Sequence, residues 1–380
     1  MRKEETHMKT FWRALGIVIA IIIIVFVSLY FIDQARMKAN EPVLFSTWGK
    51  DYSPTDKKQY IENIDVALTL EDEIGENAAW CGTFQLIWND LKNELAKQDI
   101  IFSPQPKTVD NLNKETFDVS QLSEDSYYKV YGHPTLALKE EIEKALEEKF
   151  GETSDILDDF EWSEENDQDY FLYTMLKKEF EFENEFTDLE KGKFGNYEDV
   201  SYFGINEATD DRVGRQVEVL YYHSVNDFAI KLITKGNDEI IINKGGDGTT
   251  FKAIYDHIKE EEGKYQGGRM LMEGENLKIP NLQFKIKEEI KDVENKPFHF
   301  STGEEYVIDK AIQTIEFELN KKGGKIKSEA GMSNRLTSML EPTEKRNFSV
   351  DNTFSIFLIE RGKDTPYFAA KISDITKFQK

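Results

Sequence analysis

The chain is 380 residues long, carries a formal net charge of -24 and contains 26 Phe and 16 Tyr. This length allows one large domain or two ordinary ones with a substantial apolar core, which excludes a chain that is disordered throughout. The acidic balance argues against nucleic acid or anionic lipid headgroups as partners, because both attract clusters of Lys and Arg.

The first predicted element is a membrane span. Residues 14–32 (ALGIVIAIIIIVFVSLYFI) contain no charged side chain, and their number is close to the roughly 20 that a helix needs to cross a bilayer. Basic residues are more frequent before this run (Arg2, Lys3, Lys9, Arg13) than after it (Arg36, Lys38). The positive-inside rule therefore favours a cytoplasmic N-terminus and an exported body.

A cleaved signal peptide is the alternative to a retained anchor. The apolar run is long for a signal peptide, and no clear small-residue cleavage site precedes Asp33. We therefore expect a cytoplasmic segment over residues 1–13, a signal-anchor helix over 14–32 and an extracytoplasmic tether over 33–60.

Cys81 is the only cysteine, so the chain forms no internal disulfide. An exported domain without disulfides fits a bacterial envelope protein, and the acidic, Ile- and Lys-rich composition fits a Gram-positive host. The sequence Trp80-Cys81-Gly82 is also found at thioredoxin-type and papain-like sites. A thioredoxin-type site needs another cysteine, which the chain lacks, and a papain-like site needs a histidine near Cys81. We therefore expect a buried helix cysteine, with a Cys81-dependent hydrolase as an alternative.

Helices are the main elements predicted for the first part of the exported chain, residues 61–150. After a strand at 63–70, the side chains of Trp80, Phe84, Ile87, Leu91 and Leu95 fall at helical spacing and predict an amphipathic helix over 78–97. A short strand is expected at 98–104. The polar stretch that follows, up to about residue 129, gives no clear signal, and a strong amphipathic helix is expected over 136–150.

Beyond residue 169 the apolar period changes from 3.6 to 2, which indicates strands. One further helix is expected near 249–261, with a Thr N-cap. The predicted strands lie at 169–176, 177–186, 198–205, 215–222, 227–233, 267–274, 277–286, 306–319, 352–360 and 365–372. The sequence thus predicts an α+β fold with large mixed or antiparallel sheets and helices mainly in the N-terminal half.

No metal or cofactor site is predicted. The GGDG sequence at 245–248 lacks the Lys-Ser/Thr of a phosphate-binding loop and is interpreted as a strand-to-helix turn. The five histidines are not at metal-ligand spacing, and the acidic run from Asp155 to Asp169 lacks a calcium-loop pattern. We interpret that run as a solvated acidic surface.

A long polar stretch, residues 318–347, separates two strand-like segments, and loops of this length are usually functional or disordered. The order of motifs around it resembles the C-terminal third of serpins, the serine protease inhibitor family. Asn320 and Gly323 match the start of the serpin hinge. The matching strand residues are Phe354, Phe357 and Ile359 in the returning strand, Pro366, Phe368 and Ile372 in the last one, and Pro280 with Phe284 further upstream.

The resemblance implies a serpin-like domain over 61–380 with a reactive-type loop at about 321–347. The usual spacing puts the scissile bond near Thr337, whereas Arg335 would suit a trypsin-like protease and Met339 or Leu340 a chymotrypsin- or subtilisin-like one. The candidate scissile region is Arg335, Leu336, Thr337, Ser338, Met339 and Leu340. The candidate hinge is Lys321, Lys322, Gly323, Gly324, Lys325, Ile326, Lys327, Ser328, Glu329 and Ala330.

Serpins inhibit by inserting the cut loop as an extra strand, which requires hinge residues that alternate between the two faces of a sheet. Alternate residues from Gly324 to Ala330 can face inward, but Ile326 is bulky and the family's central-strand histidine is Gln313 here. Together with the predicted anchor at 14–32, the resemblance implies a membrane-anchored protein that is not an enzyme. It would inhibit an extracellular serine or cysteine protease, with a non-inhibitory surface binding or structural protein as the alternative.

Overall fold

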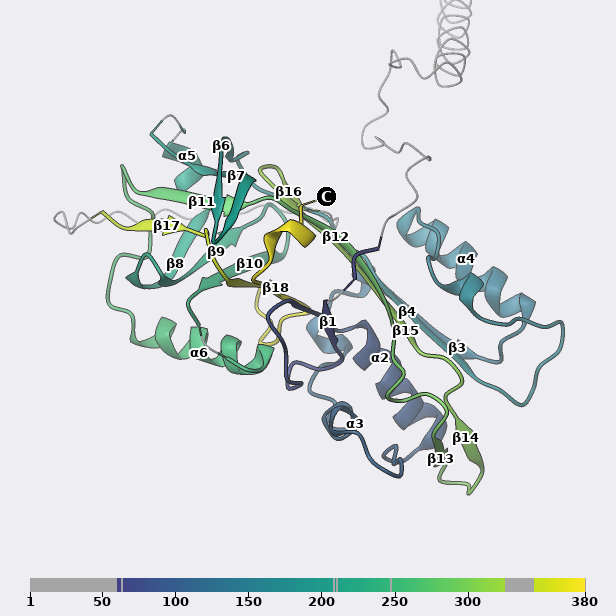
Figure 1. Ribbon diagram of the computed structural model, residues 1–380. Helices are drawn as coiled ribbons and strands as arrows, with labels where there is room; N and C mark the ends of the chain where they lie inside the picture. The colour runs from purple at the N-terminus through teal and green to yellow at the C-terminus, as the bar shows by residue number, and fades with distance from the viewer. Residues whose placement is uncertain are drawn as a thin grey trace, which may run out of the picture. The chain divides into compact units, whose positions relative to one another are not determined.

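The computed structural model describes residues 60–379 with the exception of 63, 208, 210, 247 and 325–344. These residues belong to one compact unit, Gln59–Lys380. Its strands form a seven-stranded sheet, two four-stranded sheets and two two-stranded ribbons, with few helices beside them (Figure 1). The predicted α+β class is confirmed.

The seven-stranded sheet lies at the centre of the largest hydrophobic core. Its strands in spatial order are β1 (Asp65–Ala67), β2 (Ala78–Cys81), β19 (Phe368–Ile372), β18 (Phe354–Glu360), β10 (Asp238–Lys244), β9 (Asp227–Ile233) and β8 (Val217–Ser224). All residues of β18 are buried, as expected for a strand that is covered on both faces. Helix α6 (Phe251–Lys264) contacts β18 through the rings of Phe251 and Phe357, 6.2 Å apart. It begins at the predicted Thr N-cap, because the Thr250 hydroxyl accepts a hydrogen bond from the Ala253 amide at 3.0 Å.

Two smaller sheets and two ribbons complete the β-structure. One four-stranded sheet has the order β17 (Asn347–Ser349), β11 (Asn276–Pro280), β7 (Tyr197–Ile205) and β6 (Thr187–Phe194). The other has the order β12 (Leu282–Glu289), β15 (Ile312–Asn320), β16 (Gly323–Gly324) and β5 (Phe180–Glu181). The ribbons are β3 (Tyr127–Gly132) with β4 (Phe171–Leu176), and β13 (Pro297–His299) with β14 (Glu305–Val307).

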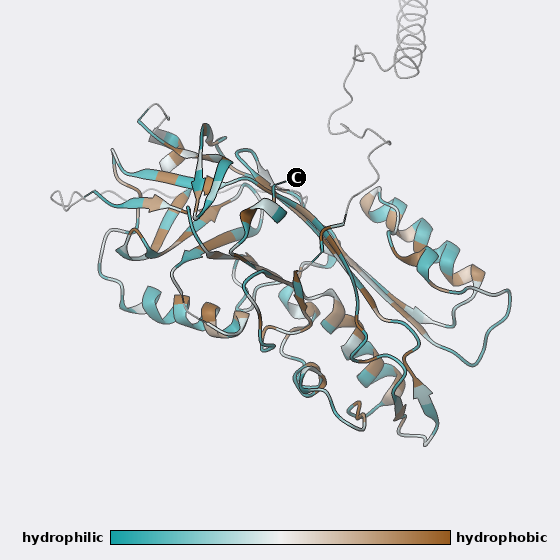
Figure 2. Cartoon of the chain, viewed as in Figure 1, coloured by the Kyte–Doolittle hydropathy of each residue, from teal (hydrophilic) through white to brown (hydrophobic). Residues whose placement is uncertain are grey.

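Apart from α6, the main helices precede the β-rich part of the chain. They are α2 (Thr83–Asp90), which continues into the wider helical turn η1 (Leu91–Ala96), α3 (Lys107–Leu112) and α4 (Leu136–Phe150). The remaining helical segments are η2 (Val119–Gln121), η3 (Glu124–Ser126), η4 (Leu157–Asp159), α5 (Asp211–Gly214) and η5 (Ile375–Lys377). In Figure 2, α4 and α6 carry apolar residues among polar ones, as amphipathic helices do. The apolar stripe of α4 is Leu138, Ile142 and Leu146, all buried against the β3–β4 ribbon.

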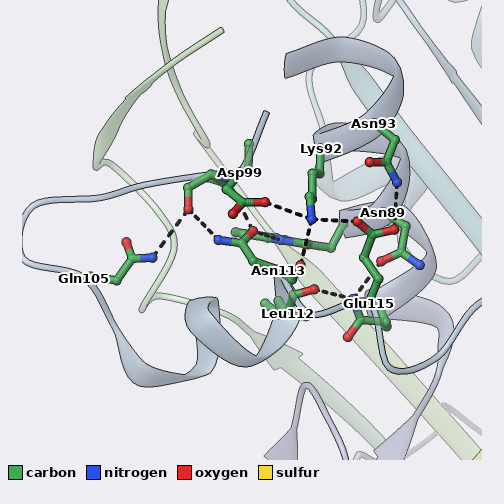
Figure 3. A network of polar contacts seen from close by, with 11 residues as sticks. Asn89, Lys92, Asn93, Asp99, Gln105, Leu112, Asn113 and Glu115 are labelled. Carbon is green, nitrogen blue, oxygen red and sulfur yellow. Dashed lines mark hydrogen bonds and ion pairs between the residues drawn. The ribbon is translucent and has the colours of Figure 1, made fainter. Parts of the chain in front are cut away.

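A polar network orders the stretch around α3 that the sequence left unassigned (Figure 3). The Lys92 ammonium of η1 pairs with Asp99 at 2.8 Å and with Glu115 at 2.7 Å. It also donates a hydrogen bond to the Asn113 carbonyl at 2.7 Å. One lysine thus joins the chain on both sides of α3 to the preceding helix.

The helix predicted over 78–97 is wrong in its first residues. Ala78–Cys81 form β2, and the helix begins at Thr83. All residues of β2 are buried between β1 and β19, and a strand buried on both faces has no alternation that would distinguish it from a helix. Trp80 shares the spacing of the helical residues Phe84 and Leu91 without sharing their structure.

The short strand predicted at 98–104 is also wrong. Ile100 and Phe102 are buried and Ile101 is exposed, so the alternation is real, but no described strand pairs with this segment. Side chains satisfy its backbone instead. The Phe102 amide donates to the Gln105 side chain at 2.7 Å, and the Ile100 carbonyl accepts from the Asn113 side chain at 2.8 Å.

Three further strand predictions need correction. The segment 277–286 is divided at Pro280 into β11 and β12, which belong to different sheets. The strand predicted at 267–274 does not form; only Met270 of this segment makes an isolated bridge, to Glu218 of β8. The strand predicted at 306–319 is divided into β14 and β15, which belong to different sheets. Strands β3, β6, β10, β13 and β17 were not predicted.

The predicted membrane anchor at 14–32, the cytoplasmic segment at 1–13 and nearly all of the tether at 33–60 lie outside the described residues. Within the part of the chain that the structure describes, no helix is both long and apolar enough to cross a membrane.

Candidate functional site

The described part of the predicted hinge, Lys321–Gly324, forms a tight turn that leads from β15 into β16. β16 is antiparallel to β15 on one side and to β5 on the other. The Asn320 side chain closes the turn by accepting a hydrogen bond from the Lys322 amide at 2.9 Å. The hinge therefore begins as a short strand between β15 and β5.

Both lysines of the turn contact the chain that follows β5. The Lys322 carbonyl accepts a hydrogen bond from the Phe182 amide, and the Lys321 carbonyl accepts one from the Phe186 amide, each at 2.9 Å. The Lys321 ammonium pairs with Asp188 at 2.7 Å and with Glu185 at 3.0 Å. These hydrogen bonds raise the pKa of Lys321, the larger part coming from Asp188.

The two glycines of β16 fit where no other residue would. Gly323 has a φ of +144°, and a Cβ atom there would lie 2.1 Å from the Phe180 carbonyl oxygen. A Cβ atom on Gly324 would lie 2.3 Å from the Glu318 carbonyl oxygen. Since both obstacles are backbone atoms, a side chain at either position would push β16 away from its neighbours.

Among the described residues, the strands beside β16 show strand pairing mainly on one side. β15 pairs with β12 along its whole length, but on its other side it pairs only through Leu319 and Asn320 with β16. β4 pairs with β3 alone. We call the edge of β15 that faces away from β12 (312–318) and the edge of β4 that faces away from β3 (171–176) the acceptor edges. β4 leads directly into β5, and one strand, β16, fills the position between β5 and β15.

Gln313 of β15 lies where the serpin pattern has a histidine. Its amide nitrogen donates to the Cys81 carbonyl at 2.9 Å and to the Thr83 hydroxyl at 3.1 Å. Gln313 therefore joins β15 to the beginning of α2. Its side-chain oxygen is buried and makes no hydrogen bond with the described residues, and neither does the Thr174 hydroxyl of β4.

Lys178, in the chain between β4 and β5, is the centre of a buried charged group that we call the Lys178 cluster. The cluster consists of Lys178, Asp238, Glu360, Tyr367 and Ser123. The Lys178 ammonium pairs with Asp238 and, at 2.7 Å, with Glu360, and its three charged members are at most 5% exposed. Tyr367 donates to Asp238 at 2.9 Å, and the Ser123 hydroxyl donates to Glu360 at 2.6 Å. The cluster connects the chain beside the hinge to the seven-stranded sheet.

The pKa values of the two carboxyls of this cluster are shifted in opposite directions. Burial, only partly offset by Lys178, raises the pKa of Asp238 above its usual range. Burial acts in the same sense on Glu360, but hydrogen bonds from Lys178 and Ser123 outweigh it, so the pKa of Glu360 lies below its usual range. Asp238 is thus the member of the pair that gains a proton first on acidification.

Arg346 anchors the chain where it leaves the loop. Its guanidinium makes two bonds to the Glu275 carboxylate, at 2.8 and 2.9 Å. It also donates to the Met270 carbonyl at 2.8 Å and to the Tyr265 hydroxyl at 3.0 Å, and it lies 5.3 Å from the centre of the Phe348 ring. This bidentate geometry is the strongest arrangement of an arginine and a carboxylate.

The pKa shifts of Arg346 and Glu275 both favour the charged forms of these side chains. Burial opposes ionisation of Glu275, but the hydrogen bonds from Arg346 outweigh it and hold the pKa of that carboxyl below its usual range. Burial likewise opposes the charged form of Arg346, and its bonds to Glu275 raise its pKa nonetheless. The pair lies next to β17, the edge strand that follows the loop.

Cys81 does not have the surroundings of a nucleophile. It lies at the end of β2 and is buried, and burial raises the pKa of its thiol. A catalytic cysteine needs the opposite shift and a neighbouring base. In the described residues the histidines have other neighbours: Tyr170 for His133, Glu261 for His223, Tyr221 for His257 and Glu305 for His299. Cys81 is buried as predicted, but in a strand rather than a helix.

The other predicted site residues lie outside the described residues. This holds for Arg335, Leu336, Thr337, Ser338, Met339 and Leu340 of the scissile region and for Lys325, Ile326, Lys327, Ser328, Glu329 and Ala330 of the hinge. Lys178, Arg346 and Glu275 were not predicted. The only signal for them was a charged residue beside a strongly apolar strand. Among the described side chains, no group of His, Cys, Asp and Glu is placed to hold a metal ion.

No model of a protein family and no curated protein matches the sequence. Among solved structures, the chain is similar to human thyroxine-binding globulin, with a TM-score of 0.44 and 12% identity over 78% of this chain and 91% of that one. It is similar to Serpin48 of the insect Tenebrio molitor, with a TM-score of 0.39 and 13% identity over 79% and 92% of the two chains. It is also similar to the thermophilic serpin Tengpin, with a TM-score of 0.43 and 10% identity over 80% and 90%.

Proposed function

We propose that this chain is a membrane-anchored, extracytoplasmic serpin-like protein that presents residues 325–344 as bait to a serine or cysteine protease. It performs no catalysis of its own and needs no cofactor. In this proposal the protease cuts the loop within Arg335–Leu340, and the part of the loop that follows Gly324 then extends β16 along the acceptor edges.

One observation carries the proposal: β16 already occupies the strand position between β5 and β15. Strand extension from a formed turn adds hydrogen bonds without a new nucleation step. In this proposal, further loop residues would pair with amide and carbonyl groups along the acceptor edges. Because the strand period is 2, the alternation from Gly324 to Ala330 continues the pattern that β16 starts.

The test is to mix the full chain, solubilised in detergent, with trypsin-, chymotrypsin-, subtilisin- and papain-like proteases. We expect an SDS-resistant complex of chain and protease with at least one of them. A Gly324→Val variant should be cut as a simple substrate, because its side chain would meet the Glu318 carbonyl. A Lys322→Ala variant in the exposed turn is the matched control and should still form the complex. Loop cleavage without any complex would contradict the inhibitory role.

The alternative is a non-inhibitory surface protein that uses the same scaffold for binding. The Lys178 cluster favours it, because a buried charged connection beside the hinge resists movement of the strands around it. The two functions differ in one readout. Cleavage of the loop should raise the midpoint of thermal unfolding strongly if the loop inserts, and should leave it nearly unchanged if the protein only binds.

We also propose that residues 14–32 span the membrane with residues 1–13 on the cytoplasmic side. The uncharged apolar run and the excess of basic residues before it support this orientation. Protease treatment of intact cells should digest the domain from outside and leave an epitope tag on the N-terminus protected. A domain recovered free in the medium would instead indicate a cleaved signal peptide.

A further inference from the structure

Aromatic side chains gather where the β3–β4 ribbon meets β14. Tyr131 and Leu172 are partners in the register of β3 with β4, and the same register, continued past the strand ends, brings His133 opposite Tyr170. The rings of His133 and Tyr170 stack there with their centres 4.9 Å apart. Since strand residues two apart face the same side, these four side chains share one face of the ribbon.

The β13–β14 ribbon extends this face with further rings. Tyr306 of β14 and Phe300, which follows β13, lie 5.9 and 6.0 Å from the ring of Tyr170, and their own rings stack 4.1 Å apart. Phe300 is buried, whereas Tyr131 and Tyr170 are 41% and 39% exposed. We call Tyr131, His133, Tyr170 and Tyr306 the aromatic patch. Contiguous exposed groups of this kind commonly mark interaction sites on a protein surface.

Two carboxylates lie beside the aromatic patch. Burial raises the pKa of Tyr306, and the neighbouring Tyr170, Glu304 and Asp169 raise it further, as negative charges close to a phenol do. The His133 ring donates a hydrogen bond to the Asp169 carbonyl at 2.7 Å. This bond fixes the backbone of Asp169 next to the stacked rings.

Neither carboxylate has a cationic partner among the described side chains. Asp169 accepts a hydrogen bond from the Asn166 side-chain amide at 2.9 Å, and Glu304 accepts one from the Thr302 hydroxyl. Both carboxylate residues are exposed. The patch thus combines exposed rings with two negative charges that no described lysine, arginine or histidine neutralises.

This combination selects a cation. The face of a tyrosine ring attracts positive charge, and the two carboxylates act in the same direction, whereas both repel an anion. A guanidinium group fits better than an ammonium group, because it is planar, stacks on aromatic rings and can donate two parallel hydrogen bonds to one carboxylate. The net charge of -24 would also draw a basic partner toward the chain.

We propose that the aromatic patch, with Asp169 and Glu304, is a docking site for an arginine side chain on a basic segment of a partner protein. The guanidinium lies against the exposed rings and pairs with the carboxylates. No residue of the site belongs to the hinge, the loop or the acceptor edges, so the docking site does not depend on the proposed function.

The test measures binding of a labelled peptide of alternating arginine and glycine to the full chain in a neutral detergent, by fluorescence anisotropy. The Asp169→Asn/Glu304→Gln double variant should bind this peptide at least about tenfold more weakly, because two charge-assisted bonds are lost. The control variant, Glu164→Gln/Asp167→Asn, removes the same charge from exposed positions of the segment before β4. Because distant exposed charges are screened, the control should change the affinity less than about twofold.

Tyr170→Leu tests the rings without changing the charge, and it should weaken binding about two- to fivefold. A peptide with citrulline in place of arginine keeps the planar group without its charge and should not bind. A peptide with lysine should bind more weakly than the arginine peptide, because an ammonium group neither stacks nor forks. Circular dichroism of each variant checks that the fold is retained.

Equal weakening by the double variant and the control would show attraction to net charge alone and would overturn the docking site. Unchanged affinity in Tyr170→Leu would overturn it as well, and so would binding of a neutral oligosaccharide in place of the arginine peptide. None of these measurements involves loop cleavage, so their failure would leave the proposed function unaffected.

Discussion

Replacement of Arg346 by alanine should destabilise the protein strongly. The substitution removes both guanidinium bonds to Glu275, whose carboxylate side chain is only 4% exposed. Two backbone amides remain as partners of that charge, the Met272 amide at 2.8 Å and the amide of residue 346 at 3.1 Å. Removing one member of a buried pair costs about 3–5 kcal/mol, because the other charge stays buried without compensation. We expect a loss of that size in the free energy of unfolding, measured by urea denaturation.

The matched control for this prediction is Arg361→Ala. Arg361 also faces a carboxylate, Glu239, at 3.5 Å, but its side chain is 47% exposed. Because an exposed pair contributes little, the expected loss is below about 1 kcal/mol. A double variant, Arg346→Ala with Glu275→Gln, should recover part of the loss by removing the buried charge. A loss below about 1 kcal/mol for Arg346→Ala would refute the reasoning.

The pH dependence follows from the lowered pKa of Glu275. A carboxyl with a lower pKa in the folded state than in the unfolded chain stabilises the fold above its unfolded pKa, about 4.3. That contribution is lost as the pH falls through the folded pKa. In Arg346→Ala the side-chain bonds to Glu275 are lost while its burial remains, so the pKa of Glu275 rises relative to the wild type. The stability difference between wild type and variant should therefore narrow as the pH is lowered from 7 toward 4.

Three further predictions concern the hinge and the core. Lys178→Met leaves two buried carboxylates unpaired and should cost about 3–5 kcal/mol, with the loss decreasing on acidification as the carboxyls take up protons; urea unfolding at several pH values measures this. Gly323→Ala should displace β16 and speed hydrogen exchange of the Phe182 amide. The control Gly303→Ala, also at positive φ but with open space around its Cβ, should cost only the backbone strain of about 1 kcal/mol. Native Cys81 should react with thiol reagents orders of magnitude more slowly than the unfolded chain, because it is buried with a raised pKa.

Local signals made some elements predictable from the sequence. Helix α4 has the predicted bounds because Thr135 caps its start, Gly151 takes the left-handed conformation at its end and the apolar residues keep one period between them. The turn into the hinge was also predictable, since Asn320 and the glycines that follow favour a tight turn. Strand β2 was missed because continuous burial carries no period.

The charged contacts of the site could not be predicted in the same way. Arg346 meets Glu275 and Lys178 meets Glu360 across long stretches of chain, and only the folded structure brings them together. A sequence pattern indicates which face of a helix or strand is apolar. It does not indicate which charged residue, distant in sequence, pairs with a buried charged side chain. Asp155 and Asp159 are the clearest case. Their acidic run was interpreted as a solvated surface, but in the fold the two carboxylates pair with Lys285 and Lys287 of β12.

The two ends of the loop are held by different interactions, and this difference bears on how the proposed insertion would be controlled. β16 is held by backbone hydrogen bonds that further strand residues would simply continue. β17 pairs with β11 over three residues and is anchored mainly by Arg346. While the loop is uncut, insertion must pull β17 from its sheet and break the Arg346 bonds, whereas a cut loop can insert without disturbing β17. Arg346→Ala should therefore allow slow spontaneous insertion, seen as a gradual rise in the thermal midpoint of uncleaved protein at moderate temperature. An uncleaved variant whose midpoint stays constant while the cleaved form rises would show that Arg346 does not restrain the loop.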